Sequence, residues 1–600
     1  MHGKGSRVDL HLHSRYSRSA DDWMLEKFKI QECYSDPLTV YRIAKNRGMD
    51  FVTLTDHDTI NGALELAHLP DFFISEEITA FFPQDRAKVH VLAYGINEKQ
   101  HADIQKCRRN LYELISYLRS EGIVHALAHP FFRMGPPLTL DHFEQMLVLF
   151  NVFEVKNGGK QLVPDNLLDL IFQHLTPERL YQLAEKHRLE PHGAEPWRKS
   201  RIAGSDDHGG ILISVPHTRV ETSATPTELL ANIGAGRCLP IGHGGSPLAV
   251  AHGALAVTLQ FAKRNKHQFD PIDNELIWKL LENVFEELTQ HNRLALAAAF
   301  LGAELKTLIR WKKGRRSRSK IFKKFLKDQD VISMLKGERR FDHEQNLRFF
   351  GVVNQLINEL LSEMIQLDDE GIKLRKVKKL AVLIPLLIPY LVSFRTENAD
   401  RPLMRKAARA FLPPELQLPR KIVVFSDHPP SSAEELEDIQ DVLAKELESG
   451  FTYTYFSLHK EKAACEEQLN FKPVALLQRQ FNFHLPPILE TAFALSEQNC
   501  ELIYIHTLGP MGVLGMLLGK LMKIPVIAGF NERYVSETTL LCRDNRLASR
   551  LIAMVYSLAD EIRLLDFPSA EAEAILERSK TQISIVGGSV QLGLEAAHSI

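Results

Sequence analysis

The chain opens with a short segment, RVDLHLHSRYS, in which apolar and polar residues alternate. A period of two predicts a β-strand with one apolar face. The other face of this strand then carries Asp9, His11 and His13. Such a face either binds a ligand or belongs to a half-exposed strand with chance histidines. The choice depends on whether partner groups recur along the chain.

A short apolar strand that carries a histidine or carboxylate recurs several times before residue 210. The strand in MDFVTLTDHDTING ends in such groups, and FFISEEITAFF, KVHVLAYGI, GIVHALAHPFF, NVFEVKNGG and SRIAGSDDHGG follow the same design. The groups are, in chain order, Asp56, His57, Asp58, Glu76, Glu77, His90, His129, Glu154, Asp206 and His208. This recurrence favours a shared binding site.

Helical patterns separate these strands. Residues 37–47 have apolar side chains at helical spacing before Gly48, and residues 102–121 form a longer amphipathic run before Gly122. Alternating strands and helices predict parallel strands. If these units close into a barrel, the strand ends converge on one mouth, where barrel enzymes hold their catalytic groups.

Composition limits the class of protein. The 600 residues correspond to roughly three or four domains of about 150 residues. With 44% hydrophobic and 25% charged residues the chain is typical of a globular protein, and a net charge of −2 gives no overall attraction to nucleic acid. The six cysteines form no CxxC pair, which argues against a thiolate zinc site and fits a reducing compartment. The N-terminus lacks the apolar core of a signal peptide, so we expect a cytoplasmic protein.

The candidate ligands are imidazoles and carboxylates without thiolates, a set that suits Mn, Fe or Zn. Their number exceeds the three or four ligands that one ion needs, so we expect two or three divalent metal ions. Clustered ions activate water and stabilise the charge of an in-line displacement at phosphorus. Phosphoester hydrolysis is the chemistry that this set favours.

The motifs HLH, TDHD, SEEIT, VHV, AHPF and SDDH, in this order over about 250 residues, resemble those of the PHP (polymerase and histidinol phosphatase) family. The resemblance implies a distorted seven-stranded β/α barrel, active as a phosphatase or nuclease on a two- or three-metal site. Carried over by motif, the implied metal ligands are His11, His13, His57, Glu77, His90, His129, Asp206 and His208. Glu77 is preferred to Glu76 as the glutamate that bridges two ions. Some trinuclear members have a further histidine shortly after HxH, and SRYSRSADDW has none.

Catalytic and phosphate-binding groups follow from the same region. Asp206 or Asp56 is expected to accept a proton, and Asp56 is alternatively a ligand or a partner of His57. Arg15, Arg18 and Arg133 near the mouth are candidates for bidentate phosphate contacts, or are solvated surface groups. We expect a phosphorylated small molecule or nucleotide as the substrate, and nucleic acid less, because the barrel region has no basic stripe.

Residues 254–418 show long helical periodicity and predict a mainly helical domain. Within it, residues 310–327 concentrate basic side chains between aromatic ones, and residues 373–392 place a basic run before an apolar one. Both segments are candidates for contact with an anionic membrane surface at the inner face of the membrane. The alternative is a packed helix with a solvated basic face.

Residues 419–600 again alternate strands and helices, and residues 500–530 read as a βαβ unit. The stretches IHTLGPMGVLG and SLADEIRLLDFPSAE resemble the N-terminal, Rossmann-like half of a GT-B glycosyltransferase of the family 4 type. The turn SDHPPSS lacks the usual glycines, and a nucleotide-sugar domain does not follow. The sequence is therefore either a piece of a longer protein, or this half domain binds without transferring a sugar.

We therefore predict an α/β protein with three parts. Residues 1–253 form a distorted (β/α)7 PHP barrel, residues 254–418 a helical linker domain, and residues 419–600 a single Rossmann-like domain. The predicted function is hydrolysis of a phosphate ester by a metal-activated water. The alternative is a glycosyltransferase or a lipid or glycan assembly protein, in which the barrel is accessory.

Overall fold

The computed structural model of this chain describes most of both ends and part of the middle. The described residues are 5–17, 31–132, 134–160, 166–264, 343–368, 371–374, 380–428, 451–458, 468–478, 483–530, 552–553, 555–564, 576–579 and 581–585.

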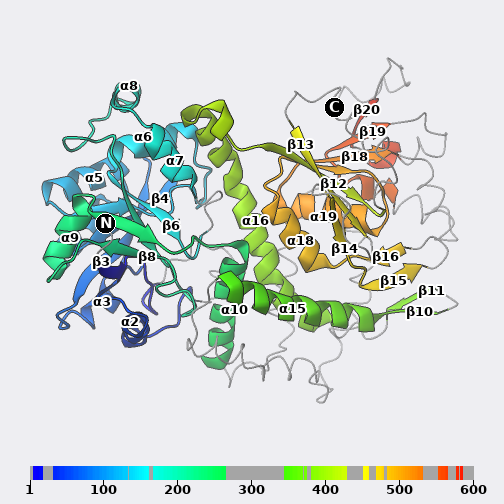
Figure 1. Ribbon diagram of the computed structural model, residues 1–600, viewed down its shortest axis with the longest axis horizontal. Helices are drawn as coiled ribbons and strands as arrows, with labels where there is room; N and C mark the ends of the chain where they lie inside the picture. The colour runs from blue at the N-terminus through cyan, green and yellow to red at the C-terminus, as the bar shows by residue number, and fades with distance from the viewer. Residues whose placement is uncertain are drawn as a thin grey trace. The chain divides into compact units, whose positions relative to one another are not determined.

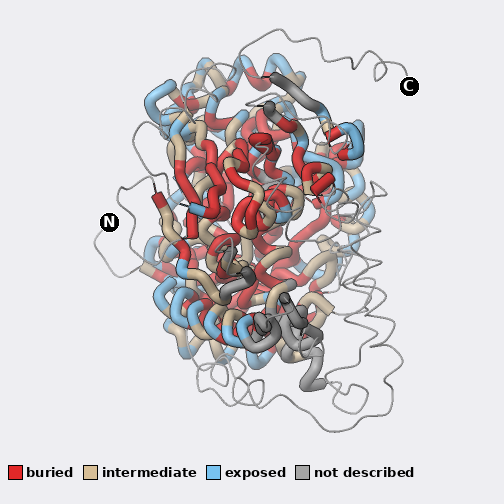
Figure 2. Tube along the Cα trace, turned by 90° about the vertical axis from the view of Figure 1, so that its right-hand side faces the viewer, coloured by how far each residue is buried: buried red, intermediate tan, exposed pale blue. Residues whose placement is uncertain are grey.

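The chain forms two compact units (Figure 1). Among the described residues, the first unit holds residues 5–264, 343–353 and 385–418. The second unit holds residues 354–384 and the described residues from 419 to 585. In Figure 2 buried residues lie in the interior, and exposed residues lie on the outer turns of the chain. The predicted domain boundaries at residues 253 and 418 stay predictions.

A mixed sheet of nine strands forms the centre of the first unit, in the order β7-β6-β5-β4-β3-β2-β1-β8-β9. The strands are β1 (Ser6–Asp9), β2 (Phe51–Leu54), β3 (Phe72–Phe81), β4 (Lys88–Tyr94), β5 (Val124–Leu127), β6 (Val152–Asn157), β7 (Ser200–Gly204), β8 (His217–Val220) and β9 (Cys238–Ile241). The alternation of strands and helices predicted parallel strands, and the family resemblance implied seven of them; the described sheet departs from both expectations. β4 is antiparallel to β3 and β5, and β8 is antiparallel to β1 and β9. One reason is the short turn between β3 and β4, which leaves no room for a crossover helix.

The sheet curls until its two ends lie side by side, so it is nearly closed. Thr218 on β8 replaces part of the missing ladder: its hydroxyl accepts a hydrogen bond from the backbone N–H of Ala203 on β7 at 2.9 Å and donates to the carbonyl of Ala203 at 2.8 Å. The thiol of Cys238 on β9 lies 3.5 Å from the carbonyl oxygen of Arg201 on β7. These contacts give the unit a barrel-like form.

Helices cover the outside of this sheet. They are α2 (Pro37–Asn46), α3 (Asn61–Leu64), α4 (Glu98–Cys107), α5 (Leu111–Ser120), α6 (Leu140–Leu149), α7 (Leu167–His174), α8 (Pro177–His187), α9 (Pro226–Gly234) and α10 (Pro247–Arg264). The helix expected at residues 37–47 is α2, and Gly48 after it has a φ of +87°. The single helix expected at residues 102–121 is wrong, because Asn110 starts a new helix by accepting a hydrogen bond from Tyr112 N at 3.1 Å.

The described part of residues 254–418 is helical apart from one hairpin. It contains α15 (His343–Met364), the hairpin β10 (Ile365–Asp368) and β11 (Gly371–Leu374), α16 (Leu380–Phe411) and a 3-10 turn (Pro414–Leu416). Within the first unit, His252 on α10 contacts Asn346 of α15 through Nδ1 at 2.6 Å and the hydroxyl of Tyr390 on α16 through Nε2 at 2.9 Å. Leu403, Met404 and Leu412 share the large apolar core of the barrel-like unit.

The predicted membrane contacts are not tested by these elements. Residues 310–327 and 375–379 lie outside the described residues. Among the described helices, none combines the length and the apolar character that a transmembrane span requires. Binding of residues 373–392 to anionic lipid stays a prediction.

A parallel sheet of seven strands forms the centre of the second unit, in the order β14-β13-β12-β17-β18-β19-β20. Its described elements are β12 (Arg420–Ser426), β13 (Phe451–Leu458), β14 (Gln468–Phe471), the hairpin β15 (Ala475–Gln478) and β16 (Phe483–Leu485), α18 (Ile488–Glu497), β17 (Leu502–Ile505), α19 (Pro510–Met522), β18 (Val526–Phe530), β19 (Glu561–Leu564) and β20 (Gln582–Ile585). The βαβ unit expected at residues 500–530 is confirmed as β17, α19 and β18. The resemblance to a glycosyltransferase half domain stays a prediction.

Candidate metal centre

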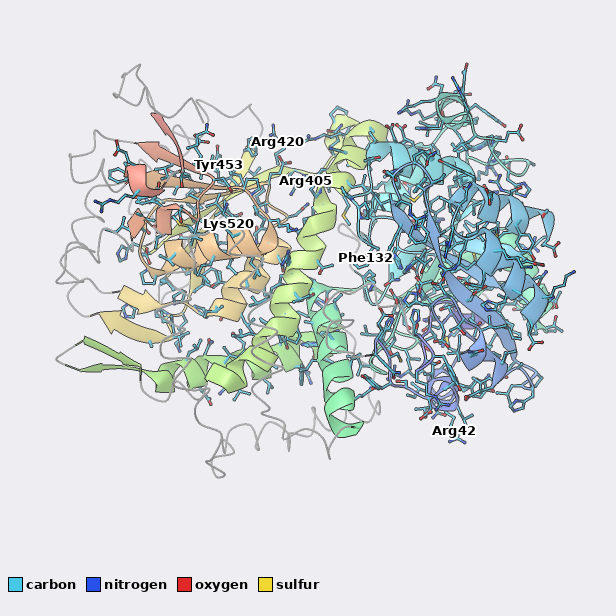
Figure 3. The ribbon with its side chains drawn as sticks, turned by 180° about the vertical axis from the view of Figure 1, so that it is seen from behind. Arg42, Phe132, Arg405, Arg420, Tyr453 and Lys520 are labelled. Atoms are coloured by element: carbon cyan, nitrogen blue, oxygen red, sulfur yellow. The ribbon has the colours of Figure 1, made fainter. Side chains whose placement is uncertain are left out.

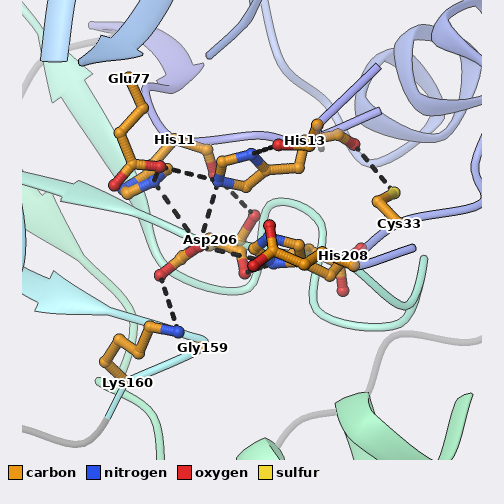
Figure 4. A network of polar contacts seen from close by, with 12 residues as sticks. His11, His13, Cys33, Glu77, Gly159, Lys160, Asp206 and His208 are labelled. Carbon is orange, nitrogen blue, oxygen red and sulfur yellow. Dashed lines mark hydrogen bonds and ion pairs between the residues drawn. The ribbon is translucent and has the colours of Figure 1, made fainter. Parts of the chain in front are cut away.

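The barrel-like unit brings all eight predicted metal ligands into one cluster. Figure 4 shows five of them, His11, His13, Glu77, Asp206 and His208. The parallel strands β1, β2, β5 and β7 deliver histidines and an aspartate from the loops after their carboxyl ends, while Glu77 and His90 lie within β3 and β4. All eight side chains are buried or half-buried. The close approach of β7 to β1 requires Gly204, because a Cβ there would lie 2.3 Å from the Cβ of His11.

Glu77 lies at the centre of the cluster, and its two oxygens face different histidines. Its Oε2 atom is 3.0 Å from Nε2 of His11, 3.2 Å from Nε2 of His13 and 3.2 Å from Nδ1 of His57. Its Oε1 atom is 2.6 Å from Nδ1 of His90 and 3.1 Å from Nε2 of His129. One carboxylate therefore joins two groups of imidazole nitrogens.

Asp206 has a similar division between its two oxygens. Its Oδ1 atom lies 3.2 Å from Nε2 of His13, 3.6 Å from Nε2 of His11 and 3.6 Å from Nδ1 of His208. Its Oδ2 atom accepts a hydrogen bond from the amide of Asn157 at 3.2 Å. The backbone of Asp206 is left-handed, with a φ of +49°, which turns this carboxylate back toward the histidines after β1.

Groups behind the cluster fix the orientation of its histidines. Glu154 lies 3.0 Å from Nδ1 of His11 and also accepts from the backbone N–H of His129 at 3.0 Å. The hydroxyl of Ser17 lies 2.9 Å from Nδ1 of His13. A carboxylate or hydroxyl on the far nitrogen sets the tautomer and directs the other nitrogen into the site. Glu154 was visible in the sequence as a carboxylate on a strand, although the resemblance did not imply a role for it.

Two predicted carboxylates lie outside the cluster. Asp56 accepts hydrogen bonds from the backbone N–H and the hydroxyl of Ser14, at 2.6 and 2.7 Å, rather than contacting His57. Glu76 points to the other side of the sheet, 2.9 Å from Nδ1 of His101 and 3.2 Å from the amide nitrogen of Gln105.

Of the three predicted phosphate-binding arginines, Arg15 is the one that the structure describes. Arg15 forms ion pairs with Asp36 and with Glu65, so its guanidinium is engaged by carboxylates. Arg18 and Arg133 lie outside the described residues. Among the described residues, Lys160 is a cation that lies beside the cluster and could contact a phosphate, and the sequence did not single it out. Its Nζ atom lies 3.9 Å from Oδ2 of Asp206.

Lys160 is held between the cluster and an aromatic ring. Its Nζ atom lies 4.4 Å from the centre of the ring of Phe132, which is labelled in Figure 3. The side chain is 26% exposed, so it faces both Asp206 and solvent. This position allows it to meet an anion that enters the site.

Burial and neighbouring charges shift the pKa values of the cluster in both directions. Although burial opposes it, the carboxylates of Glu77 and Asp206 raise the pKa of His13 to about 9 and that of His11 well above its usual value. Burial opposes the charge of Glu77 and Asp206, yet the surrounding histidines hold the pKa of both carboxyls well below its usual range. Burial lowers the pKa of His208 to about 3 and that of His57 well below its usual value. These two rings are neutral near pH 7, which is the form that binds a metal ion.

The donor set fits divalent ions. Three overlapping groups have ligand atoms within 4.8 Å of one another. Ligand atoms about 2.1 Å from a common ion lie roughly 3 to 4 Å apart, so these spacings need little movement. The groups are His11, His13, Glu77 and Asp206; His57, Glu77 and His90; and His13, His57 and His208.

A fourth group of donors, elsewhere on the unit, has a different character. Asp141, Glu144 and His187 lie close together, but Lys186 occupies the space between the two carboxylates, at 2.8 and 2.5 Å. An internal ammonium already balances these charges. We therefore treat this group as an ion-pair network.

Comparison with known proteins gives local similarities. No model of a protein family matches the chain. An "uncharacterized protein" of Methanocaldococcus jannaschii is 34% identical over 67 residues, which are 11% of this chain and 37% of the length of that protein. The crystal structure of a "putative metal-dependent phosphoesterase" from Bifidobacterium adolescentis matches 34% of this chain and 87% of its own, with 18% identity and a TM-score of 0.21.

Proposed function

We propose that the first unit is a metal-dependent phosphoesterase of the PHP type, which hydrolyses a small phosphomonoester or a nucleotide. The observation that carries the proposal is the division of Glu77 between two sets of imidazole nitrogens. A carboxylate in this position is suited to hold two divalent ions side by side. Such ions, when bound, lower the pKa of water and neutralise the oxygens of a phosphoryl group.

The residues of the chain then have separate tasks. Glu77 and the histidines around it fix the ion positions, and Glu154 keeps His11 in the required orientation. Asp206 lies between the histidines and Lys160, so it is the carboxylate placed to receive a proton from the reacting groups. Asp56 takes no such part, because Ser14 occupies its oxygens.

The position and charge of Lys160 favour a phosphorylated substrate. It is a partly exposed cation beside the cluster, and a phosphate is a strong acceptor for an ammonium donor. The histidines below it are almost completely buried, so only a compact group can reach them. A terminal phosphate on a small molecule or nucleotide meets both conditions.

The experiment that tests this function combines metal analysis with a substrate screen. Protein purified without chelators should contain about two or three divalent ions per chain. EDTA should abolish hydrolysis of phosphomonoesters and nucleotides, and Mn²⁺ or Zn²⁺ should restore it. Metal-free protein, or hydrolysis that EDTA does not affect, would contradict the proposal. The glycosyltransferase alternative stays a prediction from the sequence.

A further inference from the structure

The loop after β7 carries two of the predicted metal ligands, Asp206 and His208 (Figure 4). The backbone N–H of Asp206 donates to the carbonyl of His11 at 2.7 Å, which fixes the start of the loop. Gly209 and Gly210 follow His208 and have no side chain with which to pack. The position of the His208 ring therefore depends on the groups that hold the backbone beside it.

A residue of α10 binds this backbone from outside the sheet. The side-chain amide of Gln260 donates to the carbonyl oxygen of Gly209 at 2.8 Å. The N–H of the same peptide group, which belongs to Gly210, donates to the carboxylate of Asp207 at 2.5 Å. Both polar atoms of the peptide group between the two glycines are thus bound, one by the loop itself and one by α10.

Close packing brings α10 against the same loop. A Cβ atom added at Gly209 would lie 3.0 Å from Cβ of Ala256 and 3.0 Å from the carbonyl oxygen of Gly253, both on α10. At Gly210, where φ is +81°, an added Cβ would lie 3.8 Å from Nε2 of Gln260. The two glycines therefore allow the helix to approach the loop closely enough for the side chain of Gln260 to reach its backbone.

Helices that come later in the chain support α10 in turn. Nδ1 of His252 donates to the side-chain oxygen of Asn346 on α15 at 2.6 Å, and Nε2 accepts from the hydroxyl of Tyr390 on α16 at 2.9 Å. The hydroxyl of Ser393, also on α16, donates to the carbonyl of Pro247 at the start of α10 at 2.6 Å. Both His252 and Tyr390 are completely buried. Helix α10 therefore joins the loop that carries His208 to α15 and α16.

We propose that Gln260 is a positioning residue for His208. Through the carbonyl of Gly209 it fixes the backbone that carries the His208 ring, whose centre lies 4.1 Å from that of the His13 ring. A displacement of about 1 Å in a group of the site is enough to slow a reaction strongly. Gln260 lies beyond residue 253, so a residue of the predicted linker domain supports the site. The inference rests on the proposed function and adds a residue that no motif identifies.

The first test measures the loop directly in full-length wild type and Gln260→Met. Methionine has nearly the length of glutamine but no amide donor. Hydrogen exchange of backbone amides is followed by mass spectrometry, in protein as purified and after EDTA treatment. We expect exchange in residues 205–214 of the variant to become about fivefold faster, because one neutral hydrogen bond is lost. Exchange in residues 37–46, which form α2, should stay unchanged. Gln260→Lys keeps a donor of similar reach and should restore the protection.

The second test measures the consequence for the reaction. With p-nitrophenyl phosphate and Mn²⁺, Gln260→Met should lower kcat about tenfold and leave KM nearly unchanged, because Lys160 keeps its position. The matched control is Gln182→Met, which replaces an exposed glutamine on α8. We expect this control to alter neither the exchange of residues 205–214 nor kcat.

The outcomes separate this inference from the proposed function. Unchanged exchange in residues 205–214 of Gln260→Met would overturn the positioning role. Faster exchange throughout the first unit, with a lower melting temperature, would also overturn it, because a residue with a merely structural role has that effect. An unchanged kcat in the variant would count against it as well. If the wild type hydrolyses no phosphoester, the proposed function is contradicted, whereas faster exchange confined to the loop after EDTA treatment would still support the role of Gln260 in holding His208.

Discussion

The replacement Glu77→Gln tests the central feature of the cluster. Glutamine has nearly the same size as glutamate, but it carries no charge and has one oxygen where glutamate has two. In the structure one oxygen of Glu77 faces His11, His13 and His57, and the other faces His90 and His129. The variant therefore cannot present an anionic oxygen to both sets.

The size of the effect follows from the contacts that are lost. A hydrogen bond to a charged group contributes roughly 1.5 to 3 kcal/mol. Glu77 faces one set of imidazoles with each oxygen, so loss of both charged contacts costs about 3 to 6 kcal/mol. Since about 1.4 kcal/mol corresponds to a factor of ten in rate, we expect hydrolysis to fall by roughly 10² to 10⁴.

The assay compares this variant with Glu76→Gln. Glu76 is the preceding residue and is equally buried, but its carboxylate contacts His101 and Gln105 on the other side of the sheet. Bound metal and the rate of hydrolysis of p-nitrophenyl phosphate are measured for both variants, with melting temperature as the check on folding. We expect metal and activity to fall only in Glu77→Gln. Full metal content and activity in that variant, or an equal loss in Glu76→Gln, would refute the role of Glu77.

Three further predictions concern other parts of the chain. Lys160→Met should raise KM for a phosphomonoester by about tenfold with a smaller effect on kcat. The control is Lys156→Met, which should leave KM unchanged because Lys156 donates to a backbone carbonyl. Equal KM values in Lys160→Met and the wild type would exclude Lys160 from substrate binding. Burial lowers the pKa of Lys199 from 10.5 to about 7, so between pH 7 and 10.5 the unfolded chain binds more protons than the folded one, and the free energy of unfolding rises with pH. Urea unfolding at several pH values should show a smaller rise in Lys199→Met than in the wild type. The same rise in both proteins would count against a depressed pKa of Lys199. Deletion of residues 419–600 should leave the metal content and phosphoester hydrolysis largely intact, because residues 385–418 belong to the first unit; loss of both in a folded truncated protein would show that the second unit helps to build the site.

Local patterns predicted the regular elements well and the sheet less well. The βαβ unit of β17, α19 and β18 was evident because an apolar run, a glycine-containing turn and a helix with small residues follow in direct succession. The break between α4 and α5 depends on one asparagine cap, which amphipathic spacing cannot reveal. The direction of β4 follows from its short turn after β3, and that of β8 from its pairing with β1, which is distant in the sequence. Alternation of elements specifies neither direction.

The residues of the candidate site that the sequence could predict lie just after the ends of strands. His11, His57 and Asp206 could be grouped from the sequence because each follows an apolar strand, and parallel strands end at the same mouth. Lys160 lies in an irregular segment, where neither the period of two nor the helical period applies. Its position depends on how that segment folds back onto the cluster, which only the structure shows.

The structure also separates two kinds of buried carboxylate that the sequence cannot distinguish. Asp207 is adjacent to Asp206 and equally buried, yet its oxygens accept hydrogen bonds from three successive backbone N–H groups, at 2.5, 3.0 and 2.7 Å. Asp9 likewise accepts from the backbone of Ser205 at 2.9 Å. Their charges are satisfied within the chain, so they stabilise loops. The Glu77 carboxylate instead contacts the imidazole nitrogens described above, which bind protons or metal ions. This difference in partners, rather than burial or position in a motif, is the reason that we assign Glu77 and not Asp207 to the candidate metal centre.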